Sequence, residues 1–385
     1  MNIRNVFGIL LLVLFLLLAF SGFFLPKKYL EPWQKDYAGK FDDPRMSLVA
    51  HGLLAANGHN LQPWKIKLDE YNNDIFYLYA DADRLAKEVD PFARQTMISQ
   101  GTFLEYIKVA GANNGYKTEF IFFPNGNYDE SNLAESMKKL PVAKITIKKS
   151  TPKDFALYDY MFMPDTNRGP YKALKPADAE ISELLKSNTD NNILLRFFRE
   201  DEEIKSLGSY IVAGAEIESS IHRIYEETKK ILRINEYEKN KYRYGFSIDG
   251  QGDSEIKKNI LQGLVTMLPF LNNEKAAAKV FMENTEIAAT NTPAYAMIMT
   301  EDNSRLSQVK AGMLYSRLIL NAHSMGLAMQ PSSQVLEEYP EMKEQYNQIK
   351  NEYAGDKTIQ ILFRIGFPSQ EAVKSMRQDV KDLMD

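Results

Sequence analysis

The chain of 385 residues contains no cysteine, only four histidines and only two tryptophans. The lack of cysteine excludes disulfide scaffolds, thiolate zinc sites, iron–sulfur clusters and cysteine nucleophiles. The histidines form no HExxH pattern and no cluster with carboxylates, which argues against a histidine-rich metal centre. An excess of one charge is also lacking, since 47 basic residues stand against 51 acidic ones. This balance argues against a nucleic-acid binder that uses a broad basic face.

What is present is the composition of a globular protein. Apolar residues make up 44% and charged residues 25% of the chain, so wholesale disorder is excluded. A chain of this length buries a large core without disulfides or metals to hold it together. Its length predicts two to three units of ordinary domain size.

Residues 6–25 form a run of 20 residues without a charge. A helix of that length would span roughly 30 Å of hydrocarbon. We therefore expect residues 1–25 to be a single-pass membrane anchor, and the polar, proline-containing residues 26–40 to be a tether. A cleaved signal peptide is the alternative, because Ala19-Phe20-Ser21 offers a cleavage site. The few flanking charges leave the side of the membrane unspecified.

Strand and helix patterns alternate beyond residue 40. Strands are predicted at 64–68, 75–80, 116–123, 142–148, 294–300 and 358–365, and helices at 44–56, 91–113, 204–233 and 309–324. From residue 177 to 233 the patterns are helical only. This interleaving predicts an α+β fold with one central antiparallel or mixed sheet flanked by helices.

An internal repeat relates two segments of the chain. Residues 101–115 match residues 312–326 at an offset of 211, and both patterns are helical and close at a glycine. Each follows a strand pattern and an acidic loop, at 81–84 and at 301–305. Many helices end at glycine, so this feature alone is weak. The shared order of strand, loop and helix predicts a duplication, with a first half at 41–160 and a second half at 161–385.

A polar loop precedes the first predicted strand and presents His59, Asn60 and Gln62 close together. Pro63 disfavours helical backbone at Gln62, so we expect the loop to be extended. Carboxamides carry both donors and acceptors and match the acceptor–donor–acceptor edge of a flavin pyrimidine ring. Asn and Gln are also common in ordinary loops, and a lone histidine is more often a surface or hydrogen-bonded residue.

The sequence Asn60-x-Gln62-Pro63-Trp64 after a helix that ends in Ala-Ala resembles the FMN-dependent nitroreductase superfamily. The fuller pattern resembles its fused, single-chain branch, the Acg-like oxidoreductases. The supporting segments occur in the family's order from residue 47 to the C-terminus: Asp81-Ala82-Asp83-Arg84, Asp90-Pro91-Phe92-Ala93-Arg94, Ile98-Ser99-Gln100-Gly101, Thr166-Asn167-Arg168-Gly169-Pro170-Tyr171, Gly326-Leu327, Pro331-Ser332-Ser333-Gln334, Arg364-Ile365-Gly366-Phe367 and Arg377.

The resemblance implies two fused halves that form a pseudo-dimer around FMN. In the first half it implies cofactor contacts from His59, Asn60 and Gln62. From the second half, Thr166, Asn167 and Arg168 would reach the ribityl phosphate, together with the C-terminal Lys374 and Arg377. Gln330, Pro331, Ser332 and Ser333 match the family loop whose backbone amide faces flavin N5. For Lys374 and Arg377, a solvated basic helix end is the alternative.

Two departures from the family pattern affect this prediction. The family's arginine-x-serine/threonine-x-arginine phosphate motif reads Pro164-Asp165-Thr166-Asn167-Arg168 here, so the first arginine is replaced and an acidic residue is added. A second site would need another Asn-x-Gln-Pro-Trp loop, but the second half offers only residues 214–222. We therefore expect at most one FMN per chain, and a monomer.

The resemblance implies that hydride passes from NAD(P)H through flavin N5 to a small electrophilic acceptor, such as a nitro compound or a quinone. It requires no acid or base side chain and no metal. One alternative is a flavin-binding or storage protein without turnover, in which residues 223–269 would cover the site. Another is a membrane-tethered scaffold with a vestigial site, which Pro164 and Asp165 would favour.

Overall fold

The computed structural model describes residues 3–152, 156–247, 249 and 255–384. Among these residues the strands build two four-stranded antiparallel sheets, in a mixed α+β fold. The first sheet has the order β1 (Trp64–Leu68), β2 (Ile75–Ala80), β4 (Ala143–Lys149), β3 (Tyr116–Phe122). The second has the order β5 (Ile193–Phe198), β8 (Tyr295–Thr300), β10 (Thr358–Gly366), β9 (Ala328–Pro331). The α+β prediction is confirmed, and the prediction of one central sheet is wrong.

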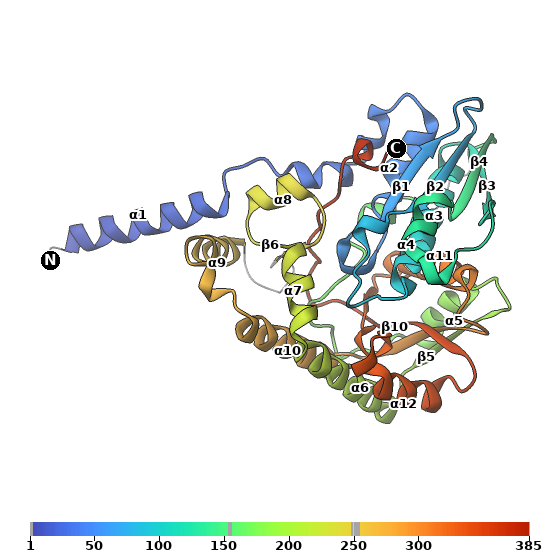
Figure 1. The fold of residues 1–385 in the computed structure, drawn as a ribbon. Helices are drawn as coiled ribbons and strands as arrows, with labels where there is room; N and C mark the ends of the chain where they lie inside the picture. The colour runs from blue at the N-terminus through green and yellow to red at the C-terminus, as the bar shows by residue number, and fades with distance from the viewer. Residues whose placement is uncertain (1–2, 153–155, 248, 250–254, 385) are drawn as a thin grey trace.

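Two long helices lie between the two sheets and hold them apart. Helix α3 (Arg94–Asn113) packs on the first sheet, α11 (Arg305–Ser324) packs on the second, and the two helices pack on each other (Figure 1). Each follows the second strand of its sheet, and each sheet runs first, second, fourth, third in chain order. The helix pair separates two cores that a single sheet would have joined.

The two helices cross at glycines. A Cβ on Gly101 would lie 1.8 Å from the carbonyl oxygen of Val309, and a Cβ on Gly312 would lie 1.9 Å from that of Ile98. The two contacts are equivalent under the offset of 211, because Gly101 corresponds to Gly312 and Ile98 corresponds to Val309. The contact is therefore nearly self-complementary, as at a twofold interface.

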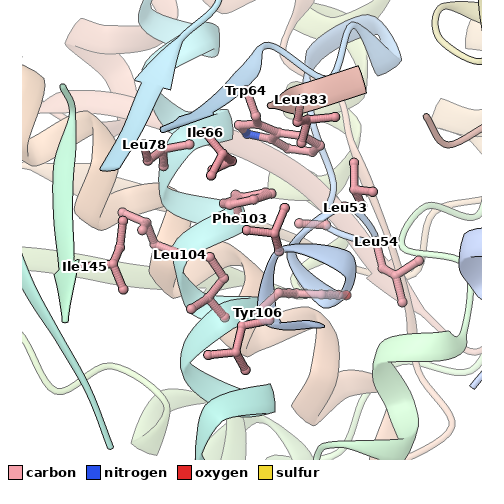
Figure 2. Packing of buried hydrophobic residues seen from close by; sticks show 14 of the residues in the cluster. Leu53, Leu54, Trp64, Ile66, Leu78, Phe103, Leu104, Tyr106, Ile145 and Leu383 are labelled. Atoms are coloured by element: carbon pink, nitrogen blue, oxygen red, sulfur yellow. The ribbon is translucent and has the colours of Figure 1, made fainter. Parts of the chain in front are cut away.

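The first core lies between β1, β2 and α3. Figure 2 shows Trp64, Ile66 and Leu78 of the sheet beside Phe103 of α3, with Leu383 of the C-terminal segment next to Trp64. The end of the chain thus packs on the opposite half from β10, and Met384 forms a bridge to Ile66 at the edge of β1.

The remaining helices surround this pair of sheets. They are α2 (Pro44–Gly52), α4 (Leu133–Lys139), α5 (Asp178–Lys186), α6 (Asp201–Ser219), α7 (His222–Ile231), α8 (Glu236–Tyr242), α9 (Glu255–Met267), α10 (Glu274–Thr290) and α12 (Lys343–Tyr353), with a small parallel pair β6 (Leu232–Arg233) and β7 (Phe246–Ser247). The predicted helix at 204–233 is broken between α6 and α7. Strand β5 was not predicted, because its sequence ILLRFF contains a single polar residue and lacks the alternation of polar and apolar residues that marks a strand.

The N-terminal segment differs most from prediction. The apolar run forms helix α1 (Ile3–Ser21), and in the described part of the chain no helix meets the length and hydropathy of a membrane span. The predicted transmembrane helix is therefore not supported. The predicted tether is packed: Tyr29, Trp33 and Tyr37 are each no more than 3% exposed. Aromatic side chains in this segment have apolar surface to bury, which its prolines and charges obscured.

Candidate flavin site

The loop at 57–62 has an unusual backbone. His59, Asn60 and Gln62 all have φ between 51° and 52°, in the left-handed region that non-glycine residues rarely adopt. The expectation of an extended Gln62 is therefore wrong. Such backbone costs on the order of 1 kcal/mol or more per residue and persists only where surrounding contacts enforce it.

Contacts on the Gln62 side chain are among those that hold the loop. Gln62 is fully buried, and its Nε2 donates to the carbonyl oxygens of Arg243 at 2.9 Å and Met376 at 3.2 Å. Its Oε1 accepts from the backbone N–H of Gln378 at 2.9 Å. The whole carboxamide is thus occupied by the protein backbone. In this structure Gln62 fixes the loop to the C-terminal segment.

Asn60 is occupied in the same manner. Its Nδ2 donates to the carbonyl oxygens of Gly245 and Met376, at 2.9 and 3.0 Å. Its Oδ1 accepts from Nη1 of Arg377 at 2.8 Å. The predicted carboxamides are therefore brought together with the predicted C-terminal arginine, 317 residues away in sequence.

Arg377 is an interior residue, 1% exposed. Its Nη2 lies 3.0 Å from Oδ2 of Asp165 and also donates to the carbonyl oxygen of Leu54. The guanidinium carbon lies 4.7 Å from the centroid of the Trp33 ring. Asp165, the acidic residue that departs from the family's phosphate motif, is thereby neutralised by its ion pair with Arg377. Arg377 is therefore not a solvated helix end, and its contact with a phosphate stays a prediction.

Arg168 is the cation left open at this place. Its side chain is exposed, and the described residues give it no hydrogen bond or ion pair. Desolvation by the surrounding protein lowers the pKa of Arg168, and the charge of Asp165 opposes this shift. Burial and the charge of Arg168 together lower the pKa of His59 to about 4. At neutral pH, an uncharged imidazole therefore lies near an unpaired guanidinium.

Unpartnered donors surround Asp165 and Arg168. The hydroxyls of Tyr106 and Tyr315 and Nε of Arg377 are buried, with no hydrogen-bond partner among the described residues. Burial raises the pKa of both tyrosines, the carboxylate of Asp165 raises it further, and Arg168 acts in the opposite direction on Tyr315. A free guanidinium with neighbouring hydroxyls has the chemistry of a phosphate site. The donor set therefore fits the phosphate end of FMN.

Arg364 joins the segment 166–171 to the segment 330–333, and it was not among the predicted site residues. Its Nε donates to Oε1 of Gln330 at 2.6 Å, and its Nη2 donates to the carbonyl oxygen of Gly169 at 2.7 Å. Its guanidinium carbon lies 4.0 Å from the centroid of the Tyr171 ring. An arginine inside the mostly apolar strand 358–365 was the available sequence signal.

The predicted residues of the second half are thereby placed side by side. The backbone N–H of Asn167 donates to the carbonyl oxygen of Met329 at 3.0 Å, and its side chain bonds to Gln370 and Gly169. Thr166 is half-buried next to it. The remaining predicted residues lie at the end of β9 and just beyond, at Gln330, Pro331, Ser332 and Ser333.

Lys374 lies on the C-terminal segment beside Trp33. Its Nζ is 5.7 Å from the centroid of that ring, the same ring that Arg377 contacts. Burial lowers the pKa of its ammonium group. Lys374 therefore joins the site through Trp33 and Arg377.

Residues 243–246 of the predicted cover lie directly on the loop. The backbone N–H of Gly245 donates to the carbonyl oxygen of Asn60 at 2.8 Å, and the Phe246 ring lies 6.1 Å from that of His59. A buried ion pair between Lys239 and Glu236, at 2.7 Å, fixes α8 just before these residues. The described part of the insertion thus covers the loop on one side.

Two cavities adjoin the region. One of about 10 Å³ lies behind the loop and is lined by Gly58, His59, Leu61, Pro63, Ala86, Asp90, Gln95, Thr96 and Ser99. The other, of about 780 Å³, lies between α6 and α10 and approaches the site at Tyr171. Groups of histidine and acidic residues able to hold a metal ion do not occur among the described residues.

Comparison with known proteins gives matches in structure only. No family model matches the chain, and no curated protein matches it. A nitroreductase-like family protein from Bacillus cereus matches 60% of this chain and 94% of its own, with 12% identity and a TM-score of 0.31. Oxidized iodotyrosine deiodinase bound to FMN and 3-iodo-L-tyrosine matches 58% and 95%, with 15% identity and a TM-score of 0.32.

A third match is the FMN-dependent nitroreductase NfnB from Mycobacterium smegmatis in complex with NADPH. It covers 53% of this chain and 83% of its own, with 10% identity and a TM-score of 0.30. Two of these three solved structures are described as a nitroreductase or as nitroreductase-like, the family that the sequence resembles.

Proposed function

We propose that the chain is an FMN-dependent oxidoreductase that passes hydride from NAD(P)H to a small electrophilic acceptor, such as a nitro compound or a quinone. The observation that carries the proposal is the unpaired Arg168 beside His59, where segments from both sheets meet. FMN, when bound, supplies the two-electron chemistry, and the protein supplies binding, orientation and charge.

The residues divide into two roles under this proposal. Arg168 and the hydroxyls of Tyr106 and Tyr315 would hold the phosphate, since these donors are free of other partners in the described chain. His59 and the segment from Gln330 to Ser333 would adjoin the ring. Asn60, Gln62, Asn167 and Arg377 would position these groups through the bonds described above. Thr166 and Lys374 would lie beside them, next to Asn167 and Trp33.

We further propose that the two halves arose by duplication and act as an internal pseudo-dimer in a monomeric protein. The equal strand order and the glycine crossing at an offset of 211 support this proposal. The segment 187–192 precedes β5 as the loop 57–62 precedes β1, and it has no Asn-x-Gln-Pro-Trp sequence and no residue in the left-handed region, while residues 214–222 lie largely within α6 and α7. One FMN per chain is therefore the most that we propose.

A flavin-binding or storage protein without turnover is the second candidate. The bonds of residues 243–246 to the loop favour it, because a covered ring would exclude a second substrate. Steady-state oxidation of NADH or NADPH with a quinone or nitroaromatic acceptor distinguishes the two candidates. Bound FMN with no oxidation would support storage, and a purified protein that neither contains nor binds FMN would refute both.

Replacing Arg168 by alanine is expected to weaken FMN binding by about 10- to 150-fold. The substitution removes a charge-assisted contact, and such contacts contribute roughly 1.5–3 kcal/mol. The measurement is a fluorescence titration of apoprotein with FMN. Arg196→Ala is the matched control, because Arg196 lies on β5 and pairs with Glu203 of α6. This variant should bind FMN like the wild type. Equal affinity in Arg168→Ala would show that the phosphate lies elsewhere.

A further inference from the structure

Two carboxyl groups lie behind the loop that follows β9, the buried Glu337 and the half-buried Glu218. Glu337 follows the short helix η8 (Gln334–Leu336) and is 4% exposed. Glu218 lies near the end of α6, which packs on η8 so closely that a Cβ on Gly214 would lie 2.8 Å from the backbone nitrogen of Val335. Because Glu218 is four residues beyond Gly214, it lies on the same face of α6. The two side chains interact electrostatically.

Neither carboxyl has a cation bonded to it in the described part of the chain. Oε2 of Glu218 is buried without a hydrogen-bond partner there, and the hydroxyl of Tyr339 interacts with Glu337. Oε1 of Glu337 accepts a long bond of 3.5 Å from Nε2 of Gln95. The pair is therefore an acidic site whose polar atoms are only partly satisfied.

The charged groups of the neighbouring segments are occupied elsewhere. Arg94 is bonded to Glu338, and Arg223 is bonded to Glu88 and Glu341. Asp90, a third acidic neighbour, accepts hydrogen bonds from the backbone of Gln95 and from Thr96. The charge of Asp90 adds to the raised pKa of Glu337, and the charge of Glu341 adds to the raised pKa of Tyr339.

Two carboxyl groups in an interior without a cation cannot both be ionised at ordinary cost. Burial raises the pKa of Glu218 to about 7. Burial and the charge of Glu218 raise the pKa of Glu337 well above its ordinary value. Such a pair titrates as a unit, and both shifts favour the protonated forms of the carboxyl groups.

The pair lies one side chain away from the flavin loop. Oε1 of Gln95 is 3.3 Å from where a Cβ on Gly58 would stand, and Gln95 also lines the small cavity behind His59. The same side chain contacts Glu337. Gln95 therefore lies between the carboxyl pair and the loop that carries His59 and Asn60.

We propose that Glu218 and Glu337 share one proton and deliver it to the acceptor that is reduced at the adjacent site. The inference rests on the proposed oxidoreductase function. For a quinone, hydride from NAD(P)H and this proton give the hydroquinone and NAD(P)⁺. The carboxyl O–H bond breaks, an O–H bond of the hydroquinone forms, and a proton from solvent restores the pair.

The first test concerns the protein without cofactor. At pH 7 the wild type should show the infrared carbonyl stretch of a buried protonated carboxyl, and Glu218→Gln/Glu337→Gln should lack it. Its free energy of unfolding should fall as pH rises from about 4.5 through about 7, because the folded state binds more protons than the unfolded chain in that window. This slope should flatten in the double variant. Glu216→Gln, an exposed position on α6, is the matched control and should keep both features.

The second test concerns quinone reduction by FMN-loaded protein. The wild-type rate should fall as pH rises through the titration of the pair, whereas the double variant should be slower by about 100-fold at pH 6 and nearly independent of pH. Absence of the infrared band in the wild type would overturn the proposal. So would a band with identical pH profiles in wild type and double variant. If FMN does not bind at all, the proposed function fails, and delivery of the proton fails with it, while the band still reports whether the pair holds one.

Discussion

Gly101→Ala is expected to lower the free energy of unfolding by about 3 kcal/mol or more. The new methyl group would meet the carbonyl oxygen of Val309 at 1.8 Å, and neither backbone can move without separating α3 from α11. Gly312→Ala should have a similar effect, because its methyl group would meet the carbonyl oxygen of Ile98 at 1.9 Å. Urea denaturation followed by circular dichroism measures both.

Gly208→Ala is the matched control for these two variants. Gly208 also lies inside a helix, α6, but the nearest atom to its would-be Cβ is 3.6 Å away. Alanine should fit there and stabilise the helix by up to about 1 kcal/mol. If Gly101→Ala and Gly312→Ala unfold at the wild-type urea concentration, the close crossing of the two halves is incorrect.

Arg377→Met is expected to destabilise the fold by about 3–5 kcal/mol, because it leaves the buried carboxylate of Asp165 without its cation. It also removes the bond to Asn60 that helps hold the strained loop. Asp165→Leu combined with Arg377→Met should recover part of that loss, since the uncompensated charge is then gone. Denaturation of the two single variants and the double variant forms the required cycle.

Arg196→Met provides the reference for this cycle. Its pair with Glu203 is partly exposed, and such pairs contribute about 0–1 kcal/mol. A loss in Arg377→Met no larger than in Arg196→Met would contradict the interior role of Arg377. If Arg377→Met lost FMN binding while its stability stayed unchanged, Arg377 would instead be a ligand of the phosphate.

The sequence alone determined the elements whose signal is local. The alternation at 64–68 and 75–80 predicted β1 and β2, and the strands at 116–123, 142–148, 294–300 and 358–365 are likewise confirmed, with ends within a residue or two. The helical repeats at 101–115 and 312–326 fall within or directly after α3 and α11. These patterns are readable because burial of one face sets a period in the residues that form it.

The tertiary structure decided what depends on residues far apart in the chain. Whether Arg377 is a free ligand or an interior ion pair is set by Asp165, 212 residues away. The satisfied amides of Asn60 and Gln62 depend on an insertion and a C-terminal segment that no local pattern connects to them. The open guanidinium of Arg168 is likewise defined by which partners the fold leaves out. Local periodicity determines which face of an element is buried, but the pairing of polar groups is decided only when the distant segments come together.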